Sequence, residues 1–308
     1  MPKSLTIITP TYNEEANIRA LIQAVREEMK NVNVSYIHLI IDNASKDATV
    51  DIVENEIHND NNVALIVNTR NFGHVRSPYY ALINCQTDGA IIIAADFEDP
   101  PSLIPKILNE WSQGVKLVCA VATNTSGSKT YNYLRSTYYK ILNKLAETPI
   151  IPQFSGYALY DQEVISHIRK MHSLDPYLRG IVSNFGYASV TIPYTRPTRT
   201  RGISKNNVRT LSGLALSGIL FHTNAPLRMF IGLGILGCIA VLLASFFYIF
   251  HKITDWDVSV GAELFVLGIF FIGFVQISAI GILSEYLRAI YKNTSGEPLV
   301  IEKYRKNY

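Results

Sequence analysis

Short apolar runs alternate with amphipathic stretches over the first part of the chain. Aliphatic and β-branched residues dominate five runs, which predict strands at 5–9, 37–41, 63–67, 90–94 and 117–122. The stretches between them place apolar residues at helical spacing, which predicts helices at 18–29, 49–56, 77–85 and 103–111. Strands that alternate with helices predict an α/β domain with a mainly parallel sheet.

Two longer apolar runs, 229–250 and 264–283, contain no charged residue. At about 1.5 Å of rise per residue, each would reach roughly 30 Å as a helix, which is the thickness of a hydrocarbon core. One such run also fits a buried helix of a soluble protein, but two in tandem favour a transmembrane hairpin. Basic residues flank its outer ends, whereas acidic residues outnumber the single lysine in the 251–263 connection. The positive-inside rule therefore predicts both termini in the cytoplasm, in a multi-pass protein of the inner (plasma) membrane with a cytoplasmic N-terminal domain.

The pattern divides the chain into four parts. We expect a cytoplasmic α/β domain at 1–205, an amphipathic juxtamembrane helix at 206–226, a two-helix transmembrane hairpin at 227–290 and a cytoplasmic tail at 291–308. Hydrophobic residues make up 48% of the 308 residues and charged residues 17%, a balance that favours membrane association. A net charge of +3 is too small to indicate nucleic acid as a partner, and the three cysteines lack the spacing of a disulfide framework or a zinc site.

Carboxylates follow the fourth predicted strand in the run Ala-Ala-Asp-Phe-Glu-Asp-Pro-Pro. Ligands of parallel α/β sheets bind beyond the carboxyl ends of the strands, so Asp96 and Glu98 are candidate ligands for Mg²⁺ or Mn²⁺ on a diphosphate. The same run fits a simpler interpretation, in which Asp99 and its neighbours cap a helix that begins near Pro101. The pattern leaves both interpretations open.

The first two predicted strands also end in polar runs. Tyr12, in Pro-Thr-Tyr-Asn-Glu-Glu, is placed to stack on a base, and Asp42 is placed to accept hydrogen bonds from a ribose hydroxyl or a base amide. Both runs fit turns and helix caps as well. Because the carboxyl ends of parallel strands meet at one edge of a sheet, we expect these runs to lie beside the carboxylates.

The ordered set of motifs resembles the family-2 inverting glycosyltransferases with a GT-A fold, specifically the dolichyl-phosphate mannose synthase and bactoprenol glucosyltransferase branch. The resembling runs are 10–15, 41–49, 69–73, 95–101, 155–157 and 199–205. The two apolar runs extend the resemblance over nearly the whole chain. It implies a GT-A nucleotide-sugar-binding domain with a mainly parallel sheet, followed by an amphipathic interface helix and two transmembrane helices.

The resemblance also implies roles for individual residues. Those that bind the nucleotide sugar would be Pro10, Tyr12, Glu14, Asp42, Arg70 and Asn71. Those that hold Mg²⁺ or Mn²⁺ would be Asp96 and Glu98. The catalytic residues would be Asp96, Arg135, Arg199, Arg201, Ser204 and Lys205. Cations in that set match the oxygens of the acceptor phosphate and of the departing diphosphate, although 199–205 also fits a basic patch that only sets membrane orientation.

The implied reaction is an inverting transfer of a hexose from UDP-glucose to polyprenyl (undecaprenyl) phosphate, which makes a lipid-linked sugar for cell-surface glycan modification. The implied partners are the UDP-linked sugar, the polyprenyl phosphate lipid, the membrane and further copies of the chain in a homo-oligomer such as a tetramer, with 297–308 as a contact between subunits. The alternatives are another donor such as UDP-GlcNAc, or a nucleotide-sugar-binding scaffold with weakened catalysis. Two departures from the family keep the scaffold open, because Ala94 and either Gln153 or Gly156 stand where relatives commonly have Asp.

Overall fold

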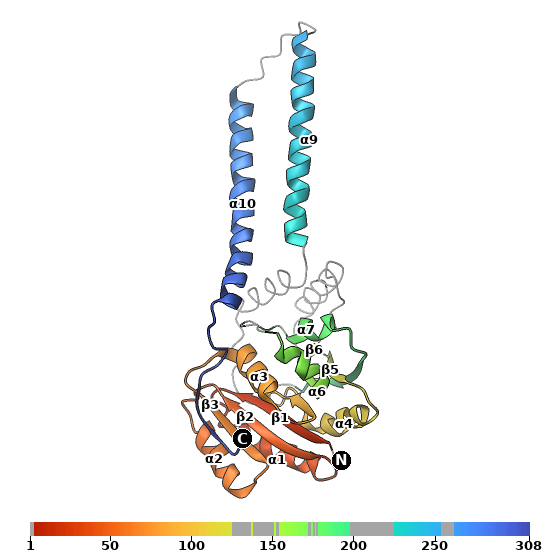
Figure 1. The fold of residues 1–308 in the computed structure, drawn as a ribbon, viewed down its shortest axis with the longest axis vertical. Helices are drawn as coiled ribbons and strands as arrows, with labels where there is room; N and C mark the ends of the chain where they lie inside the picture. Colours follow the sequence, from red (N-terminus) through yellow and green to blue (C-terminus); the bar gives the residue numbers. More distant parts are fainter. Residues whose placement is uncertain are drawn as a thin grey trace.

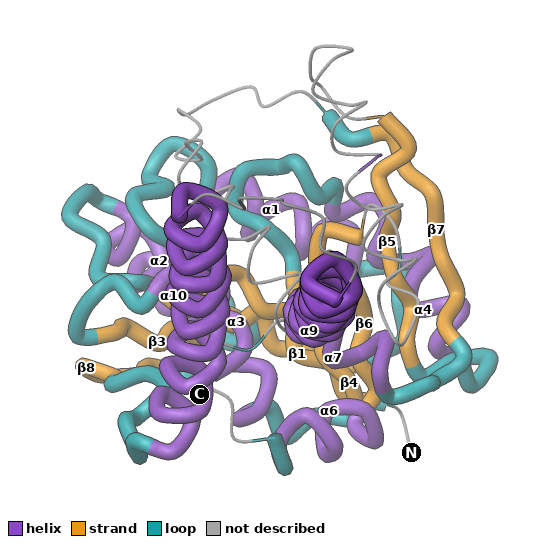
Figure 2. The backbone as a smooth tube through the Cα atoms, turned by 90° about the horizontal axis from the view of Figure 1, so that it is seen from above, coloured by secondary structure: helices purple, strands orange, loops and turns teal. Residues whose placement is uncertain are grey.

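The computed structural model describes residues 3–124, 137, 151, 154–171, 174, 176, 178–197, 225–253 and 262–308. An α/β unit forms a broad base, and two long helices rise from it side by side (Figure 1). The view along these helices shows them end-on above the α/β unit (Figure 2).

One eight-stranded sheet forms the centre of the base. Its strands are β1 (Ser4–Thr11), β2 (Ser35–Asp42), β3 (Val63–Asn68), β4 (Gly89–Ile92), β5 (Leu117–Asn124), β6 (Phe154–Asp161), β7 (Ser189–Thr195) and β8 (Glu302–Lys306). Their order is β7-β5-β6-β4-β1-β2-β3-β8. Four of the pairings are parallel and three are antiparallel within the described part of the chain. The five predicted strands are confirmed, although the fourth ends at Ile92 instead of reaching residue 94.

The direction of each strand fixes which loops meet. β1, β2, β3 and β4 are parallel neighbours. β6 is antiparallel to both β4 and β5, so β5 and its parallel partner β7 run in the same direction as β1. The chain that leaves β7 therefore emerges at the same sheet edge as the chain that leaves β4. That edge is called the carboxyl edge below.

Helices cover both faces of the sheet. They are α1 (Ile18–Met29), α2 (Thr49–Asn59), α3 (Gly73–Asn84), η1 (Pro101–Leu103), α4 (Ile104–Ser112), α6 (Gln162–Arg169) and α7 (Leu178–Asn184). On one face, Leu21 of α1 and Trp111 of α4 are buried against Ile7 of β1. On the other face, Leu82 of α3 packs in a cluster with Ile8 of β1. Alternate residues of β1 thus enter different cores, which is the two-residue period of a strand buried on both sides.

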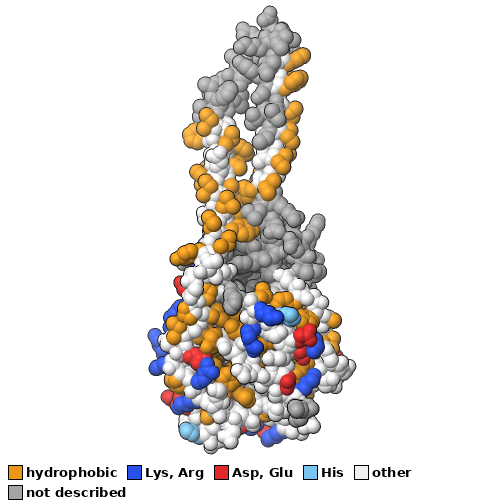
Figure 3. Space-filling view, viewed as in Figure 1, with side chains coloured by type: hydrophobic (Ala, Val, Ile, Leu, Met, Phe, Trp, Pro, Cys, Tyr) orange, Lys and Arg blue, Asp and Glu red, His pale blue; other side chains and the backbone are white. Residues whose placement is uncertain are grey.

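The two long helices are α9 (Ala225–Ile253) and α10 (Ala262–Thr294). In the described part of the chain, one stretch is long and apolar enough to cross a membrane, namely Gly268–Thr294, with 27 residues and a mean hydropathy of 1.7. Apolar side chains line the surface of both helices, whereas charged side chains gather on the α/β unit (Figure 3). The second transmembrane helix stays a prediction, and most of the juxtamembrane helix expected at 206–226 lies outside the described residues.

The end of the chain returns to the sheet, which the sequence pattern did not indicate. β8 is antiparallel to β3, with Glu302 opposite Asn68, and the N–H of Thr69 donates to the carbonyl of Ile301 over 2.9 Å. Asn307 continues the contact, because its Nδ2 donates to the carbonyls of Asn61 and Val63 over 2.8 and 2.7 Å. The tail therefore completes the sheet of its own chain and ties α10 to the base, while a tail contact between subunits stays a prediction.

Candidate active site

Four polar loops lie together at the carboxyl edge of the sheet. They follow β1, β2, β3 and β4, which occupy adjacent places in the order β4-β1-β2-β3. The register places Thr11 of β1 beside Asp42 of β2 and Ile8 of β1 beside Ile92 of β4. The expectation that the polar runs share one edge is therefore confirmed.

The loops after β1 and β2 are held together by hydrogen bonds. Asn13 has a left-handed backbone with φ of 55°, a conformation that Asn tolerates better than most residues. Its N–H donates to Ser45 Oγ over 2.8 Å, and its Oδ1 accepts from the N–H of Lys46 over 2.8 Å. The N–H of Glu14 donates to Thr49 Oγ1 over 2.8 Å. These contacts place the predicted nucleotide-binding residues of the first loop against the second loop.

Asp42 organises the second loop from the inside. Its side chain is fully buried. Oδ1 accepts from the N–H of Ser45 over 2.8 Å, and Oδ2 accepts from the hydroxyls of Ser45 and of Thr11. Burial raises the pKa of Asp42, and the hydrogen bonds from Ser45 and Thr11 oppose that rise. Contact between Asp42 and a nucleoside would require one of these neighbours to move.

A buried amide network joins the second loop to the third. Asn43 Oδ1 accepts from Asn68 Nδ2 over 3.1 Å, from the N–H of Phe72 over 3.2 Å and from the Ser77 hydroxyl. This network holds the turn that carries Arg70, whose guanidinium carbon lies 4.1 Å from the centroid of the Phe72 ring. Arg70 and its neighbour Asn71 are themselves exposed. The sequence pattern did not single out this network, because the positions of buried Asn side chains follow neither helix nor strand periodicity.

The fourth loop carries the carboxylates. Asp96 and Glu98 are half-buried, and the left-handed Phe97, with φ of 60°, separates them. The N–H of Glu98 donates to Asp96 Oδ1 over 3.2 Å, so the two acidic residues belong to one tight turn. Because this turn follows β4 directly, both carboxylates lie at the carboxyl edge.

Asp99 closes the turn that carries these carboxylates. Its buried carboxylate accepts from the N–H of Ala94 over 3.2 Å and from the hydroxyl of Tyr194 over 3.0 Å. Burial raises the pKa of Asp99 to about 6, and the positive charge of Arg196 opposes this effect. The helical turn that follows has no side-chain cap at its first residue. The interpretation of Asp99 as a helix cap is therefore wrong, and its role is to fold the loop back on itself.

Arg196 is the cation that meets the carboxylates. It follows β7, and its Nη2 lies 2.6 Å from Glu98 Oε2. The side chains of Arg196 and Glu98 are 24% and 27% exposed, so water only partly screens the pair. The sequence pattern gave no reason to choose Arg196 over the other cations after 195, because its position depends on β7 running in the same direction as β4 with β5 and the antiparallel β6 between them.

Several predicted catalytic residues lie outside the described part of the chain. They are Arg135, Arg199, Arg201, Ser204 and Lys205. Gln153, at one of the two departures from the family, is outside it as well, whereas Gly156 lies in β6 with φ of 108°. The roles of these residues stay predictions.

The donor set at the carboxylate loop fits a hard divalent cation. Magnesium sites typically use one or two carboxylates and complete their shell with substrate phosphates and water, and Asp96 and Glu98 supply two carboxylates. Within the described ranges, no group of three or more His, Cys, Asp or Glu side chains is placed to hold a metal without such help. A cation at this loop would therefore share its shell with the bound nucleotide.

Comparison with known proteins assigns the chain to a family. Residues 6–169 match the profile of Glycosyl transferase family 2. The chain belongs to this family. It is a glycosyltransferase, and the predicted resemblance to the bactoprenol glucosyltransferase branch is confirmed. The Bactoprenol glucosyl transferase of Shigella phage SfX is 30% identical over 98% of this chain and 99% of its own length. The uncharacterized glycosyltransferase YkcC of Bacillus subtilis is 28% identical over 96% of this chain and 92% of its own length.

A solved structure of the glycosyltransferase class shares the fold. Glucosyl-3-phosphoglycerate synthase from Mycobacterium tuberculosis, in complex with Mn²⁺, UDP-glucose and phosphoglyceric acid, superposes with a TM-score of 0.52. The match covers 71% of this chain and 78% of that chain at 16% identity, so it bears on the fold alone. The predicted α/β GT-A-like architecture with a mostly parallel mixed sheet is therefore confirmed.

Proposed function

We propose that this family-2 glycosyltransferase transfers glucose from UDP-glucose to a polyprenyl phosphate, such as undecaprenyl phosphate, with inversion at the anomeric carbon. One observation carries the proposal. Both chain connections between the α/β unit and the long helices are attached at the carboxyl edge, since the chain leaves β7 there and enters β8 beside the end of β3. The edge that carries the loops of the candidate site is thus the edge that the membrane connections share.

The acceptor class follows from that placement. A sugar acceptor dissolved in water gains nothing from an active site that adjoins membrane connections, whereas a phosphate on a lipid can reach the site from the bilayer surface. The phage relative, which aligns over 98% of this chain, is named as a bactoprenol glucosyl transferase, and this name supports the same class of acceptor. The product would be a lipid-linked sugar suited to the modification of cell-surface glycans.

The donor would occupy the loops after β1, β2 and β3. The residues proposed to bind the nucleotide sugar are Pro10, Tyr12, Glu14, Asp42, Arg70 and Asn71. Tyr12 and Glu14 are half-buried, while Arg70 and Asn71 are exposed at the rim. Asp42 contributes chiefly by holding the Ser45 turn in place. This division assigns base and ribose contacts to the first two loops and diphosphate contacts to Arg70.

The transfer step is a single displacement. An oxygen of the acceptor phosphate forms a bond to the anomeric carbon while the bond to the UDP oxygen breaks. A phosphate monoester has its second pKa near 6 and is largely ionised at pH 7, so the acceptor needs no general base. Mg²⁺ or Mn²⁺ held by Asp96 and Glu98 would neutralise charge on the leaving diphosphate. We assign the acceptor phosphate to Arg135 and the closure over the phosphates to Arg199, Arg201, Ser204 and Lys205.

The proposal is tested with the full chain in detergent. Radiolabelled UDP-glucose and UDP-GlcNAc are each incubated with undecaprenyl phosphate and Mn²⁺, and label in the organic phase is measured. We expect label from UDP-glucose and a β-linked product from an α-linked donor by NMR. If only UDP-GlcNAc gives label in the organic phase, the transferred sugar is GlcNAc and not glucose. Binding of UDP without lipid-linked product from any common donor would instead establish the nucleotide-sugar-binding scaffold.

A further inference from the structure

The ion pair between Arg196 and Glu98 places a guanidinium group at one of the two carboxylates that are proposed to bind the divalent cation. The two side chains meet over 2.6 Å, which is at the short end for a charge-assisted hydrogen bond. The carboxylate loop has two carboxylates at its surface, Asp96 and Glu98. The third, Asp99, accepts hydrogen bonds from Ala94 and Tyr194 with its two oxygens. A cation that binds this loop alone therefore has to take Glu98 from Arg196.

The backbone next to Arg196 is bonded to the carboxylate loop. Tyr194, near the end of β7, donates its hydroxyl to Asp99 over 3.0 Å and packs edge-on against Tyr157 with 6.3 Å between the ring centroids. Tyr157 in turn donates its hydroxyl to the carbonyl of Pro100 over 3.0 Å. The C-terminal end of the carboxylate loop is thus bonded to β6 and β7, close to the residue that follows β7, Arg196.

The Arg196 guanidinium can donate further hydrogen bonds. Its Nε is buried and has no hydrogen-bond partner among the described residues. Five N–H groups arranged in a planar fork suit phosphate oxygens as well as a carboxylate. A bound diphosphate would supply acceptors that Glu98 alone does not supply.

These observations give Arg196 opposite effects on two ligands. The positive charge repels a bare divalent cation and competes with it for Glu98, whereas it attracts a cation that arrives already neutralised by a nucleoside diphosphate. We propose that Arg196 is a positioning residue that makes the carboxylate loop a poor site for a free divalent cation and a good site for the cation–diphosphate complex. This inference rests on the proposed donor site and adds a binding order to it.

The test compares two affinities in the same variant. Free Mn²⁺ is titrated into the full chain in detergent and followed by electron paramagnetic resonance, first alone and then with UDP present. For Arg196→Gln we expect affinity for Mn²⁺ alone to rise about ten-fold and affinity for UDP in saturating Mn²⁺ to fall about ten-fold. Arg196→Lys keeps the charge, so its affinity for Mn²⁺ alone should stay close to the wild-type value.

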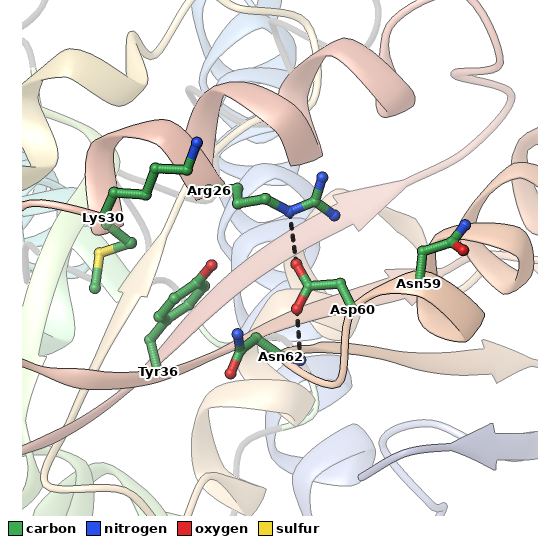
Figure 4. Close-up of a pocket in the computed structure, with 7 residues that line it drawn as sticks. Arg26, Lys30, Tyr36, Asn59, Asp60 and Asn62 are labelled. Atoms are coloured by element: carbon green, nitrogen blue, oxygen red, sulfur yellow. Dashed lines mark hydrogen bonds and ion pairs between the residues drawn. The ribbon is translucent and has the colours of Figure 1, made fainter.

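A matched control lies at the opposite edge of the sheet. Arg26 Nε lies 2.6 Å from Asp60 Oδ2, in an ion pair of similar length and exposure beside a cavity of about 420 Å³ (Figure 4). This cavity is bordered by Tyr36 and Asn62, near the amino ends of β2 and β3, so it is separate from the candidate site. Arg26→Gln should change neither the affinity for Mn²⁺ alone nor the affinity for UDP in Mn²⁺. The melting temperature of each variant is measured to establish that it is folded.

The possible outcomes separate the inference from the proposed function. If Arg196→Gln weakens Mn²⁺ binding with and without UDP, Arg196 merely supports Glu98 and the inference fails. Unchanged affinities in a folded variant overturn it as well. Failure of the wild-type chain to bind UDP in Mn²⁺ would remove the donor site and with it the proposed function.

Discussion

His38 makes the free energy of unfolding of the α/β unit depend on pH. The side chain lies in β2 and is 1% exposed, and its Nε2 pairs with Thr9 Oγ1 over 2.9 Å. Its Nδ1 is buried without a partner in the described part of the chain. Burial lowers the pKa of His38 from 6.5 to about 3, so the folded protein keeps this imidazole neutral.

The sign of the effect follows from proton binding. Below pH 6.5 the unfolded chain gains a proton at His38 and the folded chain does not, so acid favours the unfolded state until the pH approaches 3. Between pH 7 and pH 5 the loss in the free energy of unfolding is about 2 kcal/mol, from 1.36 kcal/mol for each pH unit below 6.5. For a domain of this size that corresponds to roughly 4–8 °C in melting temperature.

Another group titrates in the same range with the opposite sign. The raised pKa of Asp99, about 6, means that the folded state binds a proton there before the unfolded state does, so acid stabilises the fold through this group. The wild-type curve alone therefore mixes two effects. A His38→Gln variant keeps an amide within reach of Thr9 and removes only the imidazole, so the difference between the two curves isolates His38.

The assay is thermal unfolding of the detergent-solubilised chain from pH 7.5 to 5, followed by the fluorescence of the buried Trp111. We expect the variant to be less stable than the wild type at pH 7 because it loses ring packing, and to lose less melting temperature on acidification. Parallel curves for the two proteins over this range would show that His38 is not buried as a neutral base, and the reasoning would fail.

Three further predictions concern the site and its supports. Asp96→Asn should lower the initial rate of transfer by about 100-fold or more with little change in melting temperature, and a rate within three-fold of wild type, about 0.7 kcal/mol, would exclude Asp96 from the site. Asn68→Ala should raise the KM for the nucleotide sugar more than it lowers kcat, because it removes a donor to Asn43 Oδ1; an effect on kcat alone would contradict this. Deletion of 297–308 should lower the melting temperature and promote aggregation by exposing the edge of β3, and size-exclusion profiles that match the wild type would argue against a role for β8 in stability.

The fold of the first half could be predicted because its signals are local. The large apolar residues of α1 recur at helical spacing and face the core, and the strands that flank it are rich in β-branched residues. The strand β8 has the polar sequence Glu-Lys-Tyr-Arg-Lys, which shows no strand period. Its pairing depends on an open edge of β3, more than two hundred residues earlier in the chain. No local pattern contains that information.

The candidate site divides in the same way. The placement of Asp42, Asp96 and Glu98 at the carboxyl edge could be predicted, because Asp42 ends β2 and the other two follow β4 within a few residues. Their roles in binding stay predictions. The placement of Arg196 could not be predicted, because its arrival beside Glu98 depends on β5, β6 and β7 being ordered as they are. For Asp99 the sequence left a helix cap open, since a carboxylate before two prolines is typical of a cap, but here its carboxylate accepts hydrogen bonds from Ala94 and Tyr194 instead.

The two edge strands of the sheet are the ones that lead to the long helices. β7 and β8 lie at opposite ends of the strand order, and both connect to the helical part of the chain at the carboxyl edge. The link is reinforced by Asn293 near the end of α10, whose Oδ1 accepts from the N–H of Leu174 over 3.2 Å. The loops of the candidate site lie between the two attachments, so under the proposed function the donor site adjoins both connections to the long helices.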